Sequence, residues 1–207
     1  MVIVSVNHRL NVFGYFDLSA YGDKYKYSAN VGLMDIVDSL KWIQDNIEAF
    51  GGDPENVTLF GQSGGGCKVL NMFATSEAEG LFDQAVVQSG GEGHIDQDIA
   101  KKVTAKTLEI LGISDNEVEQ LKEVPYDTLD AAATEAQKQV GEELGTSVGW
   151  SPVLDEDYLH TDFLDWTNDV PVMVGSVFGE MNCWTALDPN ETNKKLLDRR
   201  RSRRKIN

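Results

Sequence analysis

One serine of the chain lies in a setting that favours nucleophilic chemistry. The stretch VTLFGQSGGG, residues 57–66, passes from apolar and β-branched residues into a glycine-rich run that contains Ser63. Gly61 and Gly65 stand two positions to either side, giving the pattern G-x-S-x-G. A strand that turns sharply into a helix strains the corner residue and brings these neighbours close together, so both must be small. The pattern therefore predicts that Ser63 is held out as a nucleophile at the carboxyl end of a strand.

The same corner would supply a group that stabilises negative charge. A helix that begins after Ser63 directs its free N–H groups and the positive end of its dipole at this point. The backbone N–H of Gly64 is therefore the candidate oxyanion donor. Two other interpretations stay open, a phosphate-binding turn and a purely structural glycine turn. A Walker-type phosphate loop is disfavoured because the chain continues as GCKV, residues 66–69, without the G-K-[ST] that such a loop requires.

A serine nucleophile needs two partners, a base and a carboxylate. The hydroxyl is activated by a histidine, and the carboxylate orients the imidazole and stabilises its charged form. On a sheet of parallel strands the chain order is serine, acid, histidine. The run VPVMVGSVF, residues 170–178, predicts a buried strand, and Glu180 follows its carboxyl end. Glu180 is therefore the candidate acid, with an ordinary exposed loop glutamate as the alternative.

The elements that must position these groups follow one another as strand and helix. The apolar runs predict strands at 2–7, 56–60 and 85–90, and helices at 33–49 and 64–75. This alternation predicts an α/β fold, a mostly parallel, doubly wound sheet with right-handed crossovers and helices on both faces. Residues 97–145 are polar and helical in pattern and predict an insertion lying over the sheet, and residues 150–159 predict an irregular extended stretch.

Composition and charge exclude several classes of protein. The chain has 207 residues, 41% of them hydrophobic, which is typical of a globular protein. Its net charge is −16, and eight of the 18 Lys and Arg residues fall in 194–205. The acidic remainder is expected to repel nucleic acid and anionic membranes. The basic tail, residues 194–207, is predicted to be disordered or non-native. No apolar run reaches the roughly 20 residues that span a bilayer.

The cysteine content predicts neither a disulfide framework nor a zinc site. There are only two, Cys67 and Cys183, and buried free thiols are the expected state. The nucleophilic chemistry predicted for Ser63 implies no metal and no organic cofactor. The opening MVIVSVN has neither the positively charged start nor the cleavage site of a targeting leader. Together these features favour a cytoplasmic location.

A longer stretch around the serine carries a family resemblance. The segment FGGDPENVTLFGQSGGG, with NHRLNVFGYF before it and VVQSGG after it, resembles the type-B carboxylesterase family. That family includes bacterial para-nitrobenzyl-type esterases, cholinesterases and related lipases, and the resemblance extends from residue 1 to about 190. It implies an α/β-hydrolase fold and hydrolysis of small carboxylic esters through an acyl-enzyme. It also implies that Ser63 is the nucleophile, Glu180 the triad acid and Gly64 one oxyanion donor.

The sequence also departs from the family pattern. The resemblance implies a glycine-rich oxyanion loop before the first predicted strand and a catalytic histidine far beyond Glu180. The chain has three histidines, His8, His94 and His160, and none of them follows Glu180. We therefore expect residues 1–193 to form a partial α/β-hydrolase domain, truncated at both ends and without the catalytic histidine. The alternative to an esterase is an inactive fragment or a non-catalytic binding module of the same fold.

Overall fold

The computed structural model describes residues 1–91, 93–177 and 179–180. The chain divides into two compact units, Met1–Gly175 and Ser176–Asn207, and each is described by itself. The first unit contains five strands, β1 (Thr58–Gln62), β2 (Gln84–Gln88), β3 (Ile95–Asp96), β4 (Val153–Leu154) and β5 (Val172–Gly175). Its α-helices are α1 (Asn11–Tyr15), α2 (Val31–Asn46), α3 (Gly64–Met72), α4 (Gln97–Leu111) and α5 (Tyr126–Leu144).

Short 3₁₀ turns complete this unit. They are η1 (Ser19–Tyr21), η2 (Asp23–Tyr25), η3 (Ser28–Asn30), η4 (Ile47–Phe50), η5 (Ser76–Ala78), η6 (Asp115–Glu123) and η7 (Asp165–Asp169). The predicted helix at 33–49 corresponds to α2 followed by η4. It ends at Gly51, whose φ of 77° is a left-handed conformation that glycine adopts at little cost.

The strands of the main sheet are parallel, as predicted. Their order is β1-β2-β5, and the register pairs Leu59 with Ala85 and Val87 with Val174. Because β1 and β2 are joined through α3, their carboxyl ends lie at the same edge of the sheet. The strands β3 and β4 form a separate parallel pair within the stretches that the sequence leaves as loop.

A continuous apolar core lies on one face of this sheet. Helix α2 contributes a buried stripe at helical spacing, formed by Leu33, Ile36, Val37, Leu40 and Ile43. Val69 and Met72 of α3 and Ala85 and Val87 of β2 belong to the same cluster. The shared core fixes the part of α3 that follows its first turn against the strands.

The opposite face of the sheet is open. Phe60 of β1 and Met173 of β5 point away from the core and are 59% and 70% exposed. Among the described residues, α2 and α3 pack on the face of the sheet that carries Ala85 and Val87.

Two predicted buried strands are corrected by the structure. Residues 2–7 form no strand and are mostly exposed, with Ile3 at 68%. Residues 170–178 do contain a strand, β5, but all four of its residues are exposed. A strand needs a hydrogen-bonded neighbour, and burial needs packing on its faces. Residues 2–7 pair with no described strand, and β5 has a described neighbour on one side only.

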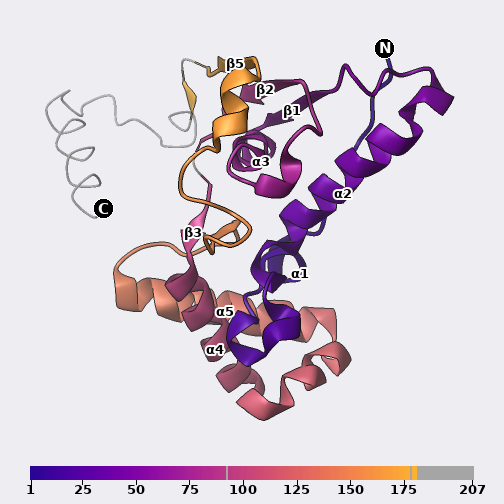
Figure 1. Ribbon diagram of the computed structural model, residues 1–207. Coiled ribbons are helices and arrows are strands. Elements are labelled where there is room, and N and C mark those ends of the chain that lie inside the picture. Colours follow the sequence, from indigo (N-terminus) through magenta and orange to yellow (C-terminus); the bar gives the residue numbers. More distant parts are fainter. Residues whose placement is uncertain (92, 178, 181–207) are drawn as a thin grey trace, which may run out of the picture. The chain divides into compact units, whose positions relative to one another are not determined.

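The insertion is helical over the range expected. Helices α4 and α5 pack on each other, and α5 also contacts α1. Figure 1 shows the insertion away from the faces of the sheet, beyond β3, with α2 running from the level of the sheet towards it. Since β3 follows the carboxyl end of β2, the insertion extends from the edge at which Ser63 lies.

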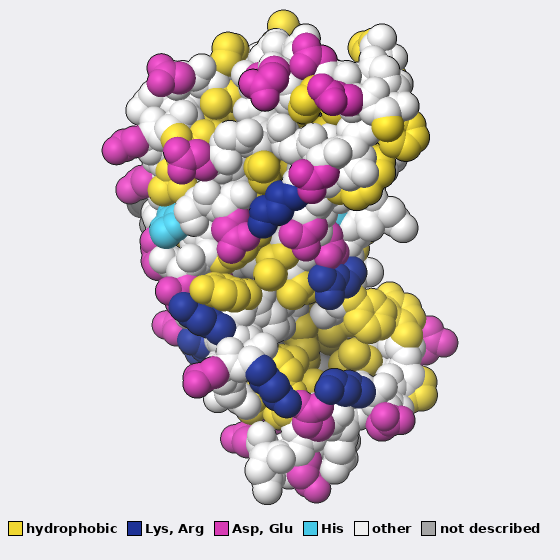
Figure 2. Space-filling view, turned by 45° about the vertical axis from the view of Figure 1, so that its right-hand side comes forward, with side chains coloured by type: hydrophobic (Ala, Val, Ile, Leu, Met, Phe, Trp, Pro, Cys, Tyr) yellow, Lys and Arg dark blue, Asp and Glu magenta, His cyan; other side chains and the backbone are white. Residues whose placement is uncertain are grey.

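Acidic and basic side chains are distributed differently over the surface. In the view of Figure 2, acidic side chains are spread over the whole face, whereas Lys and Arg lie mostly in its middle and lower parts.

Among the described helices, none combines the length and the hydropathy needed to cross a membrane. The described residues also contain no cluster of three or more potential metal ligands. Cys183 and the basic tail, residues 194–207, lie outside the described residues.

Candidate active site

Ser63 occupies the corner between β1 and α3. The strand ends at Gln62, the helix begins at Gly64, and the serine between them has φ 52° and ψ −120°. A positive φ is uncommon for a residue with a side chain and costs on the order of 1–3 kcal/mol. The strained backbone is held from both sides, because the Ser63 N–H donates to the Gln88 carbonyl and the Ser63 carbonyl accepts from the Cys67 N–H, both at 2.9 Å.

The side chain at this corner is accessible. Ser63 is exposed, and its hydroxyl makes no hydrogen bond with any described residue. A hydroxyl that is strained into place and left accessible suits attack on a bound molecule better than it suits a structural contact.

The glycines of the motif have different roles. A Cβ at Gly61 would lie 2.4 Å from the carbonyl carbon and oxygen of Gly65, which excludes any side chain there. A Cβ at Gly65 itself would meet no described atom within 4 Å, so the expectation that this residue must be small is wrong. The second tight position is Gly66, where a Cβ would lie 3.0 Å from the Gly90 Cα. The three consecutive glycines, residues 64–66, are the sequence feature that could have indicated this second position.

Gly64, the candidate oxyanion donor, lies in the first turn of α3. Gly64 is exposed and is the first residue of the helix, so its N–H has no partner within the helix. The Nζ of Lys68, one turn later, donates to the Gly64 carbonyl at 3.3 Å. Sequence reasoning missed this contact, although a spacing of four residues on a helix predicts that the two groups are neighbours.

Cys67 joins the helix to the loop that follows β2. Its sulfur accepts a weak hydrogen bond from the Gly91 N–H at 3.5 Å, and a Cβ on Gly93 would lie 2.9 Å from the Cys67 Cβ. The thiol is free and half-buried, and it serves packing between α3 and this loop.

Glu180 belongs to the second unit. Its side chain is exposed, its backbone has φ 33°, and one carboxylate oxygen accepts from the Val177 N–H at 2.7 Å. Ser63 and Glu180 therefore lie in different units, and their pairing in a catalytic triad stays a prediction.

Two of the three histidines make local contacts among the described residues. His8 is bonded through Nδ1 to the Arg9 carbonyl oxygen, at 3.1 Å. His160 lies with its Nδ1 3.9 Å from the carboxylate of Glu156, and His94 is half-buried between β2 and β3. None of them contacts the Ser63 hydroxyl among the described residues.

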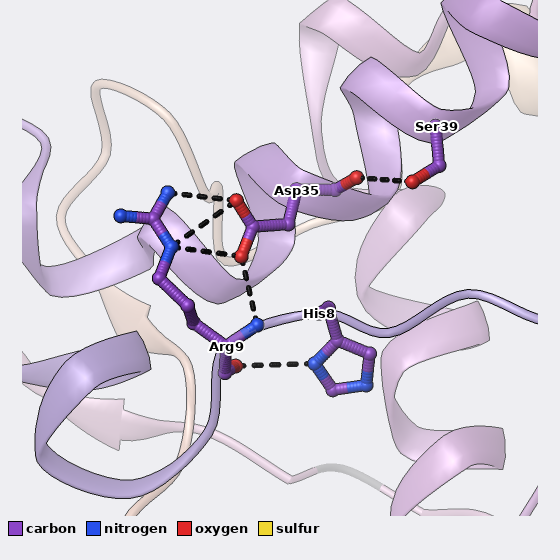
Figure 3. A network of polar contacts seen from close by, with 4 residues as sticks. All are labelled: His8, Arg9, Asp35 and Ser39. Carbon is purple, nitrogen blue, oxygen red and sulfur yellow. Dashed lines mark hydrogen bonds and ion pairs between the residues drawn. The ribbon is translucent and has the colours of Figure 1, made fainter.

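A second polar cluster joins the start of α1 to α2, and Figure 3 shows it from close by. The Asp35 carboxylate accepts from the backbone N–H of Arg9 at 2.8 Å and from the guanidinium at 2.7 to 3.2 Å. This bidentate hydrogen bond to Arg9 lowers the pKa of Asp35. The Ser39 hydroxyl donates to the Asp35 carbonyl at 2.7 Å. We refer to Arg9 and Asp35 as the arginine clamp.

The fold and this corner together define the class of protein. A parallel sheet in which a strand turns through a strained, exposed serine into a helix is the arrangement of an α/β-hydrolase. The whole chain, residues 1–207, matches the model of the carboxylesterase family, and the protein belongs to that family. This confirms the resemblance that the sequence carries.

Individual relatives agree with this assignment. The chain is 39% identical over 133 residues to the para-nitrobenzyl esterase of Bacillus subtilis, a match that covers 64% of this chain and 27% of that protein. It is similar to the solved carboxylesterase Est55 of Geobacillus stearothermophilus, with 34% identity and a TM-score of 0.76. That likeness covers 93% of this chain and 41% of the other.

A third similar structure is that of an esterase with a polymeric substrate. An esterase from Clostridium hathewayi that can hydrolyse aliphatic aromatic polyesters is 40% identical, with a TM-score of 0.76. The likeness covers 93% of this chain and 40% of that esterase. The chain thus spans about a quarter to two fifths of the length of the relatives it matches.

Proposed function

We propose that these residues form the nucleophile-bearing part of a serine ester hydrolase that acts on small carboxylic esters. The observation that carries the proposal is the exposed Ser63, strained at φ 52° beside the free N–H of Gly64. Membership of the carboxylesterase family supports the same chemistry.

The reaction follows from this geometry. A base takes the proton of the Ser63 hydroxyl, and its oxygen forms a bond to the ester carbonyl carbon. The carbonyl oxygen becomes an oxyanion, which the Gly64 N–H stabilises by donating to it. The carbon–oxygen bond to the alcohol then breaks, the alcohol leaves with the proton, and an acyl-serine remains. Water, deprotonated by the same base, attacks the acyl carbon. The bond between this carbon and the Ser63 oxygen breaks, the base returns the proton to that oxygen, and the acid is released.

A base and a carboxylate complete the proposed triad. We infer that Glu180 orients a histidine supplied by chain outside these 207 residues. His8 and His160 contact other groups among the described residues, and none of the three histidines follows Glu180 in the sequence. The 207-residue chain alone is therefore expected to be a poor catalyst, because removal of a triad member costs several orders of magnitude in rate.

The test compares p-nitrophenyl acetate hydrolysis by this chain and by its reading frame extended at both ends. We expect the extended chain to be faster by at least about 10³-fold. Ser63→Ala in the extended chain should remove the difference, whereas Ser76→Ala, a serine outside the corner, should leave it unchanged. Equal turnover by both chains, or turnover that survives Ser63→Ala, contradicts the proposal.

The alternative is a non-catalytic binding module of the same fold, since a fold can be retained when its catalytic activity is lost. The strain stored at Ser63 argues against it, because a binding surface does not require that conformation. An extended chain that folds but neither hydrolyses esters nor reacts at Ser63 would favour this alternative.

A further inference from the structure

Lys68 is an unusual residue for its position. It lies in the second turn of α3, and its ammonium donates to the Gly64 carbonyl at 3.3 Å. The same nitrogen lies 5.9 Å from the centre of the Tyr15 ring, at the outer limit of a cation–π contact. The side chain is half-buried between α3 and α1 and is thus directed back to the turn that carries the candidate oxyanion donor.

The position is electrostatically costly for a cation. Burial lowers the pKa of Lys68, which means that the charged form is disfavoured there. The amino end of a helix carries partial positive charge, and this opposes a second positive charge nearby. No described carboxylate pairs with Lys68, although 34 residues of the chain are acidic. The hydrogen bond to Gly64 is the contact that offsets these costs.

The turn that receives this bond needs support. Helix α3 begins with Gly64, Gly65 and Gly66, and each glycine inside a helix costs about 0.5–1 kcal/mol relative to alanine because of its backbone freedom. Gly61 and Gly90 approach this turn so closely that a Cβ at either glycine would clash with its backbone. The glycines are therefore needed for the close approach, and they leave the peptides beside Ser63 weakly constrained.

We propose that Lys68 is a positioning residue for the oxyanion-binding turn. Its ammonium holds the Gly64 carbonyl, fixes the peptide plane that follows the donor N–H, and replaces the constraint that the three glycines remove. This role rests on the proposed esterase function, and it extends that function to a residue that touches neither the ester nor Ser63.

The first measurement needs no catalytic activity. Hydrogen–deuterium exchange of residues 63–70 is compared in the 207-residue chain and in its Lys68→Met and Lys68→Arg variants. Lys102, an exposed lysine of α4 without a described ion pair, provides the matched control Lys102→Met. We expect Lys68→Met to speed exchange in this segment several-fold, Lys68→Arg to restore protection, and Lys102→Met to change nothing. Unchanged exchange in Lys68→Met overturns the proposal.

The second measurement separates positioning from stability. In the extended reading frame, Lys68→Met should lower kcat for p-nitrophenyl acetate about tenfold with KM unchanged, because a displaced oxyanion donor weakens only the transition state. Lys68→Arg should recover most of the loss, which a general loss of packing would not predict. A wild-type kcat in Lys68→Met, in an enzyme that Ser63→Ala inactivates, refutes the role of Lys68 and leaves the esterase proposal standing. Absence of any Ser63-dependent hydrolysis refutes the esterase proposal, while the exchange result still decides the contact.

Discussion

The corner at Ser63 and the arginine clamp are both polar, and both lie at the start of a helix or beside one. At the clamp, the Asp35 carboxylate receives a backbone N–H and a bidentate guanidinium, so its hydrogen-bonding capacity is used within the protein. At the corner, the backbone of Ser63 is fully bonded, but its hydroxyl has no described partner. The clamp therefore has the character of a site that joins two elements, whereas the corner has the character of a site that presents a reactive group.

The two sites also have opposite effects on the stability of the native state. The clamp stabilises the native state through charge-assisted hydrogen bonds. The corner costs energy through a positive φ at a residue with a side chain, and the surrounding core maintains it. A substitution at the clamp should therefore change stability without changing chemistry, and a substitution that disturbs the corner should change both.

The largest effect is expected at Gly61. Gly61→Ala places a Cβ 2.4 Å from backbone atoms of Gly65, so either β1 or the first turn of α3 must shift. We expect a loss of about 3 kcal/mol in the free energy of unfolding. In the extended chain, ester hydrolysis should fall by about 100-fold, since displacement of the nucleophile by an ångström has effects of this order.

Gly65→Ala is the matched control for that variant. Its Cβ meets no described atom within 4 Å, and alanine favours the helix by about 0.5–1 kcal/mol. Urea unfolding and esterase assays of both variants check the contrast. Equal damage from the two substitutions would show that the corner geometry is misassigned.

Much of this corner could be predicted from the sequence. The strand, the sharp turn and the helix follow from a β-branched run that passes into glycines, and α2 follows from its apolar spacing, because both patterns report local geometry. Which glycine is sterically required depends on neighbours that the pattern does not name, and so Gly65 was predicted where Gly66 was needed.

Burial was harder to predict, because it depends on distant parts of the chain. The runs at 2–7 and 170–178 are as apolar as β2, yet the first forms no strand and the second forms an exposed one. Among the described residues, only β2 has a strand on each side and a helical layer packed on its face. The pairing of Ser63 with Glu180 depends on the same kind of long-range information, and it remains a prediction.

A smaller effect is expected at the arginine clamp. Asp35→Asn removes the carboxylate charge but keeps the size of the side chain. Because the side chains of Arg9 and Asp35 are 55% and 24% exposed, we expect a loss of only about 0.5–1 kcal/mol in stability at pH 7. Asp45→Asn, on the exposed side of the same helix, is the control and should cost less.

The clamp also predicts a dependence on pH. The pKa of Asp35 is lower in the folded protein than in the unfolded chain, so its contribution is complete above the unfolded pKa of about 4. The contribution is lost as pH falls from there through the folded pKa. The stability difference between wild type and Asp35→Asn should therefore shrink below about pH 4, as urea titrations at several pH values would measure. A difference that grows on acidification would contradict the assigned role.

We propose that the corner presents Ser63 as a reactive nucleophile, and covalent labelling can detect such a residue. An organophosphonate probe is applied to the 207-residue chain and to the extended reading frame, and the modified residue is located by mass spectrometry. We predict strong labelling of Ser63 in the extended chain, its loss in Ser63→Ala, and weak or no labelling in the 207-residue chain, in which we expect no catalytic base. Robust labelling of Ser63 in the shorter chain would contradict the inference that the base lies outside these 207 residues. Failure of the folded extended chain to label at Ser63 would contradict the assignment of Ser63 as the nucleophile.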